Sequence, residues 1–207
     1  MHIERHGAWQ ALPLIAYPPL AHVAVTHRSP LLMGLALGWL ALTAAQPLLR
    51  TCKPTAWLGL GLLLLLVAFL VWQGKGLWLM VALSSALPAL AAATFTLSLR
   101  PGATPLVTAI ATRFDGPLPA EALRYTRRLT VLWAMLITAL VGVEIALFVT
   151  ASPTTWSRFA NGYAYGILAA AFVLEYAYRR IRFRHLPQSG VLRYVKNLLR
   201  TPRFGAS

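Results

Sequence analysis

Long apolar stretches alternate with short polar segments over most of this chain. A helix that crosses a bilayer needs about 20 mostly apolar residues. Six stretches approach that length, near 9–26, 31–49, 55–73, 77–98, 130–150 and 159–178. Pro13, Pro18 and Pro19 interrupt the first, so it is either a kinked span or a half-buried interfacial segment. The pattern predicts an all-α, polytopic membrane bundle of about six transmembrane helices.

The longest polar segment, 99–129, contains two predicted helices. Thr104 is suited to cap a short helix that has Pro105 at its first position. A turn follows at Asp115-Gly116-Pro117, and a second helix is expected to open at Pro119 and to continue into the stretch 130–150. Four residues, Gln73-Gly74-Lys75-Gly76, are too few for anything but a tight turn between antiparallel spans.

The chain is expected to divide into a transmembrane domain, 1–186, and a basic tail, 187–207. In the tail, apolar residues recur at helical spacing from Val191 to Leu199, and Arg193, Lys196 and Arg200 occupy the other side. This pattern is typical of a basic amphipathic helix lying on a membrane surface.

Composition supports a membrane protein. Hydrophobic residues make up 58% of the chain and charged residues 12%, about half the usual share of about 25% in soluble domains. These values exclude an ordinary cytosolic globule and a disordered chain. The single cysteine, Cys52, excludes a disulfide framework and a cysteine-based zinc site.

The positive charge follows the predicted topology. With a cytoplasmic amino terminus and six spans, Arg28, Lys75 and Arg158 lie outside and the other 16 of the 19 lysines and arginines lie inside. Cytoplasmic loops carry such an excess, so both termini are predicted to be cytoplasmic. A topology with five spans places 15 of the lysines and arginines inside and 4 outside, which is a weaker asymmetry. Since the charge tracks topology rather than one soluble face, no nucleic-acid partner is expected.

The first stretch has no clear small-x-small cleavage site, so it is expected to remain as an uncleaved anchor.

A basic cluster lies just before the apolar run 130–150. Its candidate binding residues are Arg124, Tyr125, Arg127 and Arg128. One interpretation is a positive-inside anchor against lipid phosphates. The other is a site for an anionic head group or a phosphorylated carrier, because arginine forms forked hydrogen bonds to phosphate oxygens.

Ionisable groups at membrane depth are candidate functional sites. Counted along their helices at 1.5 Å per residue, His22 and Glu144 both lie roughly 20 Å from the cytoplasmic edge and are placed to bond. Alternatively, Glu144 is protonated or reaches the outer interface. Asn161 either bonds across helices or caps its own span. Glu175 and Arg179 are spaced i,i+4 and are predicted to form a structural ion pair.

Two small-xxx-small pairs, Gly34–Gly38 and Gly162–Gly166, predict close helix packing, within the chain rather than between copies.

Signatures of known catalytic sites are missing. The sequence contains no GxSxG, GxxxxGK[ST], GxGxxG or HExxH string. A pair of catalytic carboxylates would have to be Asp115 with Glu121, six residues apart. No catalytic residue, metal or cofactor is therefore predicted, and an enzyme is not favoured.

Three strings between Leu99 and the tail carry a resemblance to a family. They are Leu118-Pro119-x-Glu121 followed by Arg124-Tyr125-Thr126-Arg127; Trp156-Ser157-x-Phe159-Ala160-Asn161; and Glu175-Tyr176-x-x-Arg179-Arg180. Together they resemble small bacterial inner-membrane proteins found beside genes for aryl-polyene and xanthomonadin-type pigment assembly. The likeness covers about half of the chain. It implies a setting, acyl-chain assembly at the inner membrane by discrete fatty-acid-synthase-like enzymes, but no mechanism.

These observations lead to three functional hypotheses. The first is an accessory scaffold that holds acyl carrier protein or condensing enzymes at the bilayer, and it is expected to show neither a site cavity nor a polar path. The second is a transporter or flippase of the lipid-linked product, with a polar path past Glu144. The third is an enzyme acting on an acyl or polyprenyl-phosphate substrate, with a cavity lined by the arginines and an acid. The sequence indicates no oligomeric state.

Overall fold

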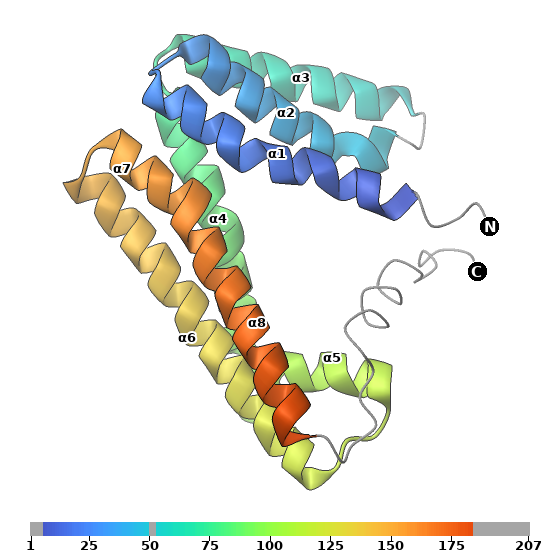
Figure 1. The fold of residues 1–207 in the computed structure, drawn as a ribbon. Helices are drawn as coiled ribbons and strands as arrows, with labels where there is room; N and C mark the ends of the chain where they lie inside the picture. Colours follow the sequence, from blue (N-terminus) through green and yellow to red (C-terminus); the bar gives the residue numbers. More distant parts are fainter. Residues whose placement is uncertain (1–5, 50–52, 184–207) are drawn as a thin grey trace. The chain divides into compact units, whose positions relative to one another are not determined.

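The computed structural model describes residues 6–49 and 53–183, and every regular element among them is helical (Figure 1). The elements are α1 (His6–Thr26), α2 (Pro30–Leu49), α3 (Pro54–Trp72), α4 (Gly76–Leu97), α5 (Leu106–Asp115), α6 (Ala120–Thr150), α7 (Pro153–Arg158), the π-helix η1 (Phe159–Tyr163) and α8 (Ala164–Arg182). The predicted all-α class is confirmed for this part of the chain. The predicted helix of the tail lies outside the described residues.

Four of the described helices are long and apolar enough to cross a membrane, namely α2, α3, α4 and α6. They match the predicted stretches 31–49, 55–73, 77–98 and 130–150, although α3 and α4 each end one residue earlier than predicted, and they indicate a membrane-embedded protein. The stretches 9–26 and 159–178 are also helical, the first in α1 and the second in η1 and α8, but these helices are not among the four.

Local sequence explains most helix boundaries. The turn between α3 and α4 forms as predicted, and Gly74 adopts φ +75°, a conformation that glycine reaches without steric cost. Helix α6 starts directly after Pro119 and runs without interruption into the apolar stretch, also as predicted. The final helical segment starts earlier than predicted, at Pro153, because the Ser152 side chain accepts a hydrogen bond from the Thr155 amide (3.2 Å).

The start of α5 differs from the prediction. Pro105 is the N-cap residue of α5, and Thr104 does not cap the helix. The hydroxyl of Ser98, at the end of α4, accepts a hydrogen bond from the Leu106 amide instead (2.9 Å). A side chain eight residues upstream therefore takes the role that was assigned to the adjacent threonine.

The described residues form two compact units. The first comprises the residues up to Pro88 together with Leu140–Ile167, and the second comprises Ala89–Ala139 together with the residues from Leu168. The boundary falls within α4, α6 and α8, so each of these helices contributes to both units.

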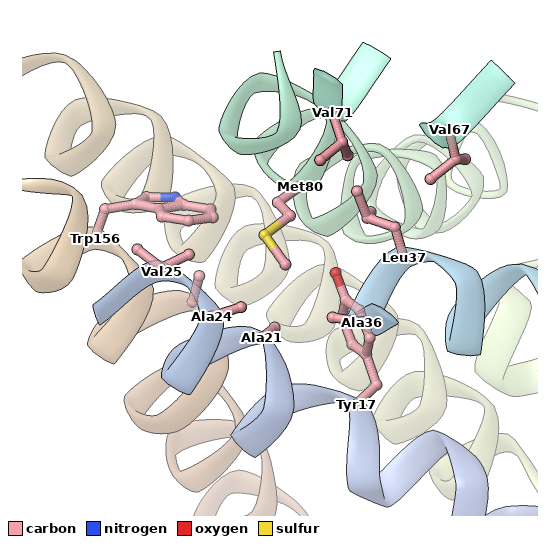
Figure 2. Close-up of a cluster of buried hydrophobic side chains, with 11 residues drawn as sticks. Tyr17, Ala21, Ala24, Val25, Ala36, Leu37, Val67, Val71, Met80 and Trp156 are labelled. Atoms are coloured by element: carbon pink, nitrogen blue, oxygen red, sulfur yellow. The ribbon is translucent and has the colours of Figure 1, made fainter. Parts of the chain in front are cut away.

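The core of the first unit brings α1, α2, α3, α4 and α7 together (Figure 2). Small residues on α1, Ala21 and Ala24, allow close approach, and Trp156 and Met80 fill the space beside them. In a bilayer, tight packing rather than water exclusion holds helices together. The cluster consists of Tyr17, Ala21, Ala24, Val25, Ala36, Leu37, Val67, Val71, Met80, Trp156 and Ala160.

The two glycine pairs behave differently. A Cβ at Gly38 would lie 3.7 Å from the Leu64 side chain of α3, and one at Gly34 would lie 4.0 Å from Val71, so α2 and α3 pack closely there. A Cβ added at Gly162 or Gly166 would have no atom of another described segment within 4 Å. The predicted close packing is therefore not found for the second pair within the described part of the chain.

In the second unit, threonines dock α5 on α6. Thr108 and Thr126 share a buried hydrogen bond between their hydroxyls (2.7 Å), and Thr130 Oγ1 accepts one from the Val107 amide (3.3 Å). Trp133 of α6 also packs on Phe172 of α8, with ring centroids 4.3 Å apart. These contacts position the two helices that form the site described next.

Candidate functional site

A groove of about 840 Å³ lies between α6 and α8, within the second unit. Its volume is within the range of about 300–1,000 Å³ that is typical of small-molecule sites. The two helices lie side by side in Figure 1, and Glu121 pairs with Arg182 while Trp133 packs on Phe172, so they run antiparallel. The lining residues on each helix recur at spacings of three and four, so each helix presents one face to the groove.

The two ends of the groove differ in polarity. Polar side chains gather where α6 begins and α8 ends: Glu121, Arg124, Tyr125, Arg128, Glu175 and Arg182. Further along α6, and correspondingly earlier on α8, the lining is apolar: Leu129, Leu132, Leu136, Ala171 and Leu174. The groove therefore changes from charged to aliphatic along its length.

Both carboxylates at the polar end are paired with arginines. Glu121 Oε1 lies 2.7 Å from Arg182 Nη2, and Glu175 Oε1 lies 3.5 Å from Arg179 Nε. The second pair was predicted from its i,i+4 spacing and is confirmed. The first joins residues 61 positions apart, so helical spacing could not reveal it.

Two other arginines of the groove, Arg124 and Arg128, have no acidic partner among the described residues. Both are exposed and line the groove, and neither has an ion pair among the described residues. Arg127 is exposed as well but does not line the groove. The structure thus separates three arginines that were grouped in the sequence: two point to the groove and one lies on another face of α6.

Aromatic rings line the polar end of the groove. The ring of Tyr125 stacks on Tyr178, with centroids 5.8 Å apart, and contacts Phe183 at 4.9 Å. Its hydroxyl donates a hydrogen bond to Glu175 Oε1 (3.0 Å). Sequence reasoning identified Tyr125 but missed Tyr178 and Phe183. The signal for Tyr178 was its place three residues after Glu175, on the same face of α8.

Glu144 lies in the first unit, with 6% of its surface exposed. The hydroxyl of Ser84 on α4 donates a hydrogen bond to Glu144 Oε1 (2.5 Å) and also lies 3.0 Å from the Val81 carbonyl. The phenols of Tyr17 and Tyr165 interact electrostatically with Glu144. Polar side chains from three other helices, α1, α4 and α8, therefore interact with this carboxyl group.

His22 bonds to a different partner. Its Nδ1 lies 3.1 Å from Ser157 Oγ, which also accepts a hydrogen bond from Asn161 Nδ2 (3.1 Å). The predicted bond between His22 and Glu144 is not formed in the described structure. Asn161 neither bonds to another helix nor caps its own span, since it lies inside η1 and bonds four residues back along the same segment.

Among the described residues, no three histidine, cysteine or acidic side chains lie together in a way that could hold a metal ion. In comparisons with protein-family models, with curated proteins and with solved structures, no match to this chain was found.

Proposed function

We propose that this chain is an integral membrane accessory protein of acyl-chain lipid assembly, of the aryl-polyene type. It would hold acidic acyl carrier protein or condensing enzymes at the bilayer. The observation that supports this proposal is the first part of α6, where Arg124, Arg127 and Arg128 are exposed and none has an ion pair among the described residues. Carrier proteins of this class are generally acidic, so their charge would complement such a surface.

The proposal includes a topology. Six spans with both termini in the cytoplasm place the 99–129 segment on the inner side of a bacterial inner membrane. A basic amphipathic helix within 187–207 would add to the same cytoplasmic surface. Its support is the excess of lysine and arginine in these segments.

Docking of a carrier protein does not by itself require the groove between α6 and α8. A protein that only scaffolds is expected to have no cavity lined by the arginines and an acid. Such a cavity is expected of an enzyme that acts on an acyl or polyprenyl-phosphate substrate. Both acids, however, are held in ion pairs with Arg182 and Arg179. The arrangement therefore favours binding of a ligand over proton transfer to it.

Transport of the lipid-linked product is a second candidate function, supported by the environment of Glu144. A carboxyl group buried among apolar helices is costly and is a functional-site candidate by default. Its polar neighbours Ser84, Tyr17 and Tyr165 come from three other helices, which is the kind of arrangement expected along a polar path.

Binding of an acyl carrier protein to the full-length protein in detergent tests the first proposal. The triple variant Arg124→Gln, Arg127→Gln, Arg128→Gln should capture the carrier about tenfold less, since each exposed charge contributes up to about 1 kcal/mol. Lys75→Gln, which removes a charge from the turn between α3 and α4, is the matched control and should bind normally. Wild-type capture and wild-type lipid product from the inserted triple variant would contradict docking.

A further inference from the structure

We propose that the groove between α6 and α8 binds a lipid with one acyl chain and an anionic phosphate head group. The phosphate lies between Arg124 and Arg128, and the chain lies along Leu132, Leu136 and Leu174. This inference goes beyond carrier docking and assumes from the proposed function only that the protein is embedded in a membrane.

The charges in the groove specify an anionic head group. Of the three arginines that line it, Arg182 is neutralised by Glu121, and Glu175 is neutralised by Arg179 from just outside the lining. Arg124 and Arg128 have no acidic partner within the described part of the chain, so an anion bound between them would balance their positive charge. A cationic or neutral head group would not.

The spacing of the two arginines suits a phosphate. Residues four apart on a helix have their Cβ atoms about 6 Å apart on one face, so two long side chains at those positions can converge on one group. Guanidinium groups form paired, charge-assisted hydrogen bonds to phosphate oxygens. Tyr125, between them in sequence, has its hydroxyl bonded to Glu175 and its ring on Tyr178, so it forms the wall of the groove rather than competing for the anion.

The apolar end specifies a hydrocarbon chain. From Arg128 to Leu136 the groove follows α6 for eight residues, or about 12 Å. Leu129, Leu132 and Leu136 face Ala171 and Leu174 there, with no charged side chain in this part of the lining. A free phosphate would leave this part of the groove unused, and an acidic peptide would place polar backbone against it.

The size of the groove favours a single chain. Its volume of about 840 Å³ lies within the range for ligands of drug size. A lipid with one chain and a compact head group belongs to that class, whereas a phospholipid with two chains would leave its second chain outside. The occupant is therefore distinct from the general lipid of the bilayer.

The test measures binding of 1-palmitoyl lysophosphatidic acid to the full-length protein in detergent by native mass spectrometry and titration calorimetry. One molecule should bind. Arg124→Gln and Arg128→Gln should each weaken binding about tenfold, which corresponds to about 1.4 kcal/mol. Arg127→Gln is the matched control, since it removes the same charge from the same helix outside the groove, and it should leave the affinity within about twofold.

A second pair of variants tests the apolar end. Leu132→Trp places a bulky ring in the groove and should abolish binding of the lipid. Met135→Trp places the same ring three residues further along α6, at a position that is 62% exposed and does not line the groove, and it should have no effect. Circular dichroism and gel filtration of all variants confirm that the fold is retained.

The choice of probes decides between ligand classes. Equal affinity for lysophosphatidylcholine would overturn the anionic head group. Inorganic phosphate that binds as tightly as the lipid would overturn the role of the chain, and dipalmitoyl phosphatidic acid that binds as tightly would overturn the single chain. Equal losses for Arg127→Gln and Arg128→Gln would show a general surface charge effect and contradict the site. Carrier docking can fail independently, because it is expected to depend on Arg127 as well.

Discussion

At the scale of one residue, Glu144 shows how the fold shields an ionisable side chain in a helix that is long and apolar enough to cross a membrane. A charged side chain at the centre of a bilayer costs about 3 kcal/mol on insertion scales. In the structure Glu144 is buried against α4 and bonded to Ser84, so the helices of the first unit shield it from their surroundings. This partner lies 60 residues away in sequence and comes from another predicted span.

The substitution Glu144→Gln tests whether this residue is structural. Glutamine keeps the oxygen that accepts from Ser84 and has no charge to bury, so the variant should insert at wild-type abundance and support wild-type lipid product. Membrane abundance and lipid at the cell surface are measured together, with Ser84→Ala as the companion variant. Normal abundance with lipid trapped in the inner membrane would instead favour transport through the Glu144 site.

At the scale of an element, α6 combines two regions with different partners. Its first turns carry the exposed arginines and also bury Thr126 and Thr130 against α5. Its later turns carry the apolar residues that make it long enough to cross a membrane. The amphipathic helix α5 is thus attached to the same turns of α6 that form the polar end of the groove.

Substitution of Thr126 by valine should weaken the attachment of α5. The change leaves the buried Thr108 hydroxyl without its 2.7 Å partner, at a cost of about 1–3 kcal/mol for an unsatisfied buried polar group. Hydrogen exchange should therefore become faster in residues 106–115 and stay unchanged in α3. Thr112→Val, which alters an exposed threonine of α5, is the control. Unchanged exchange in α5 of the Thr126→Val variant would show that other contacts hold this helix.

At the scale of the whole molecule, charge and hydropathy together predict an orientation in the membrane. In the predicted topology, 16 of the 19 lysines and arginines lie in polar segments that the positive-inside rule assigns to the cytoplasm. Arginine and lysine in short loops set the orientation of bacterial membrane proteins, so this distribution makes a definite prediction about each loop.

Reporter fusions test that prediction. A reporter after Ser207 and one inserted at Gly102, in the exposed loop between α4 and α5, should both be cytoplasmic, and one at Lys75 should be periplasmic. A reporter at the amino terminus distinguishes six spans, which place it inside, from five, which place it outside. A periplasmic signal at Gly102 would invert the proposed arrangement.

Local pattern was sufficient to predict most of the helices. The helix α6 could be predicted because Pro119, Glu121 and the following apolar run all favour one continuous helix, and the pair Glu175–Arg179 because both residues lie on one face. The predictions failed where a distant side chain took part. Ser98 capped α5 in place of Thr104, and Ser157 bonded to His22 in place of Glu144.

Hydropathy, charge and the residues that start or stop helices act over short stretches of sequence. The sequence by itself therefore determined that this protein is helical, apolar and basic, and where most of its helices begin and end. Only the tertiary structure decided which faces of α6 and α8 meet. Because Arg182 pairs with Glu121 and Trp133 packs on Phe172, one face of α6 and one face of α8 together line one groove. Of the three nearby arginines, only Arg124 and Arg128 lie on the face of α6 that lines this groove, because residues four apart share a helix face and the packing decides which face meets α8.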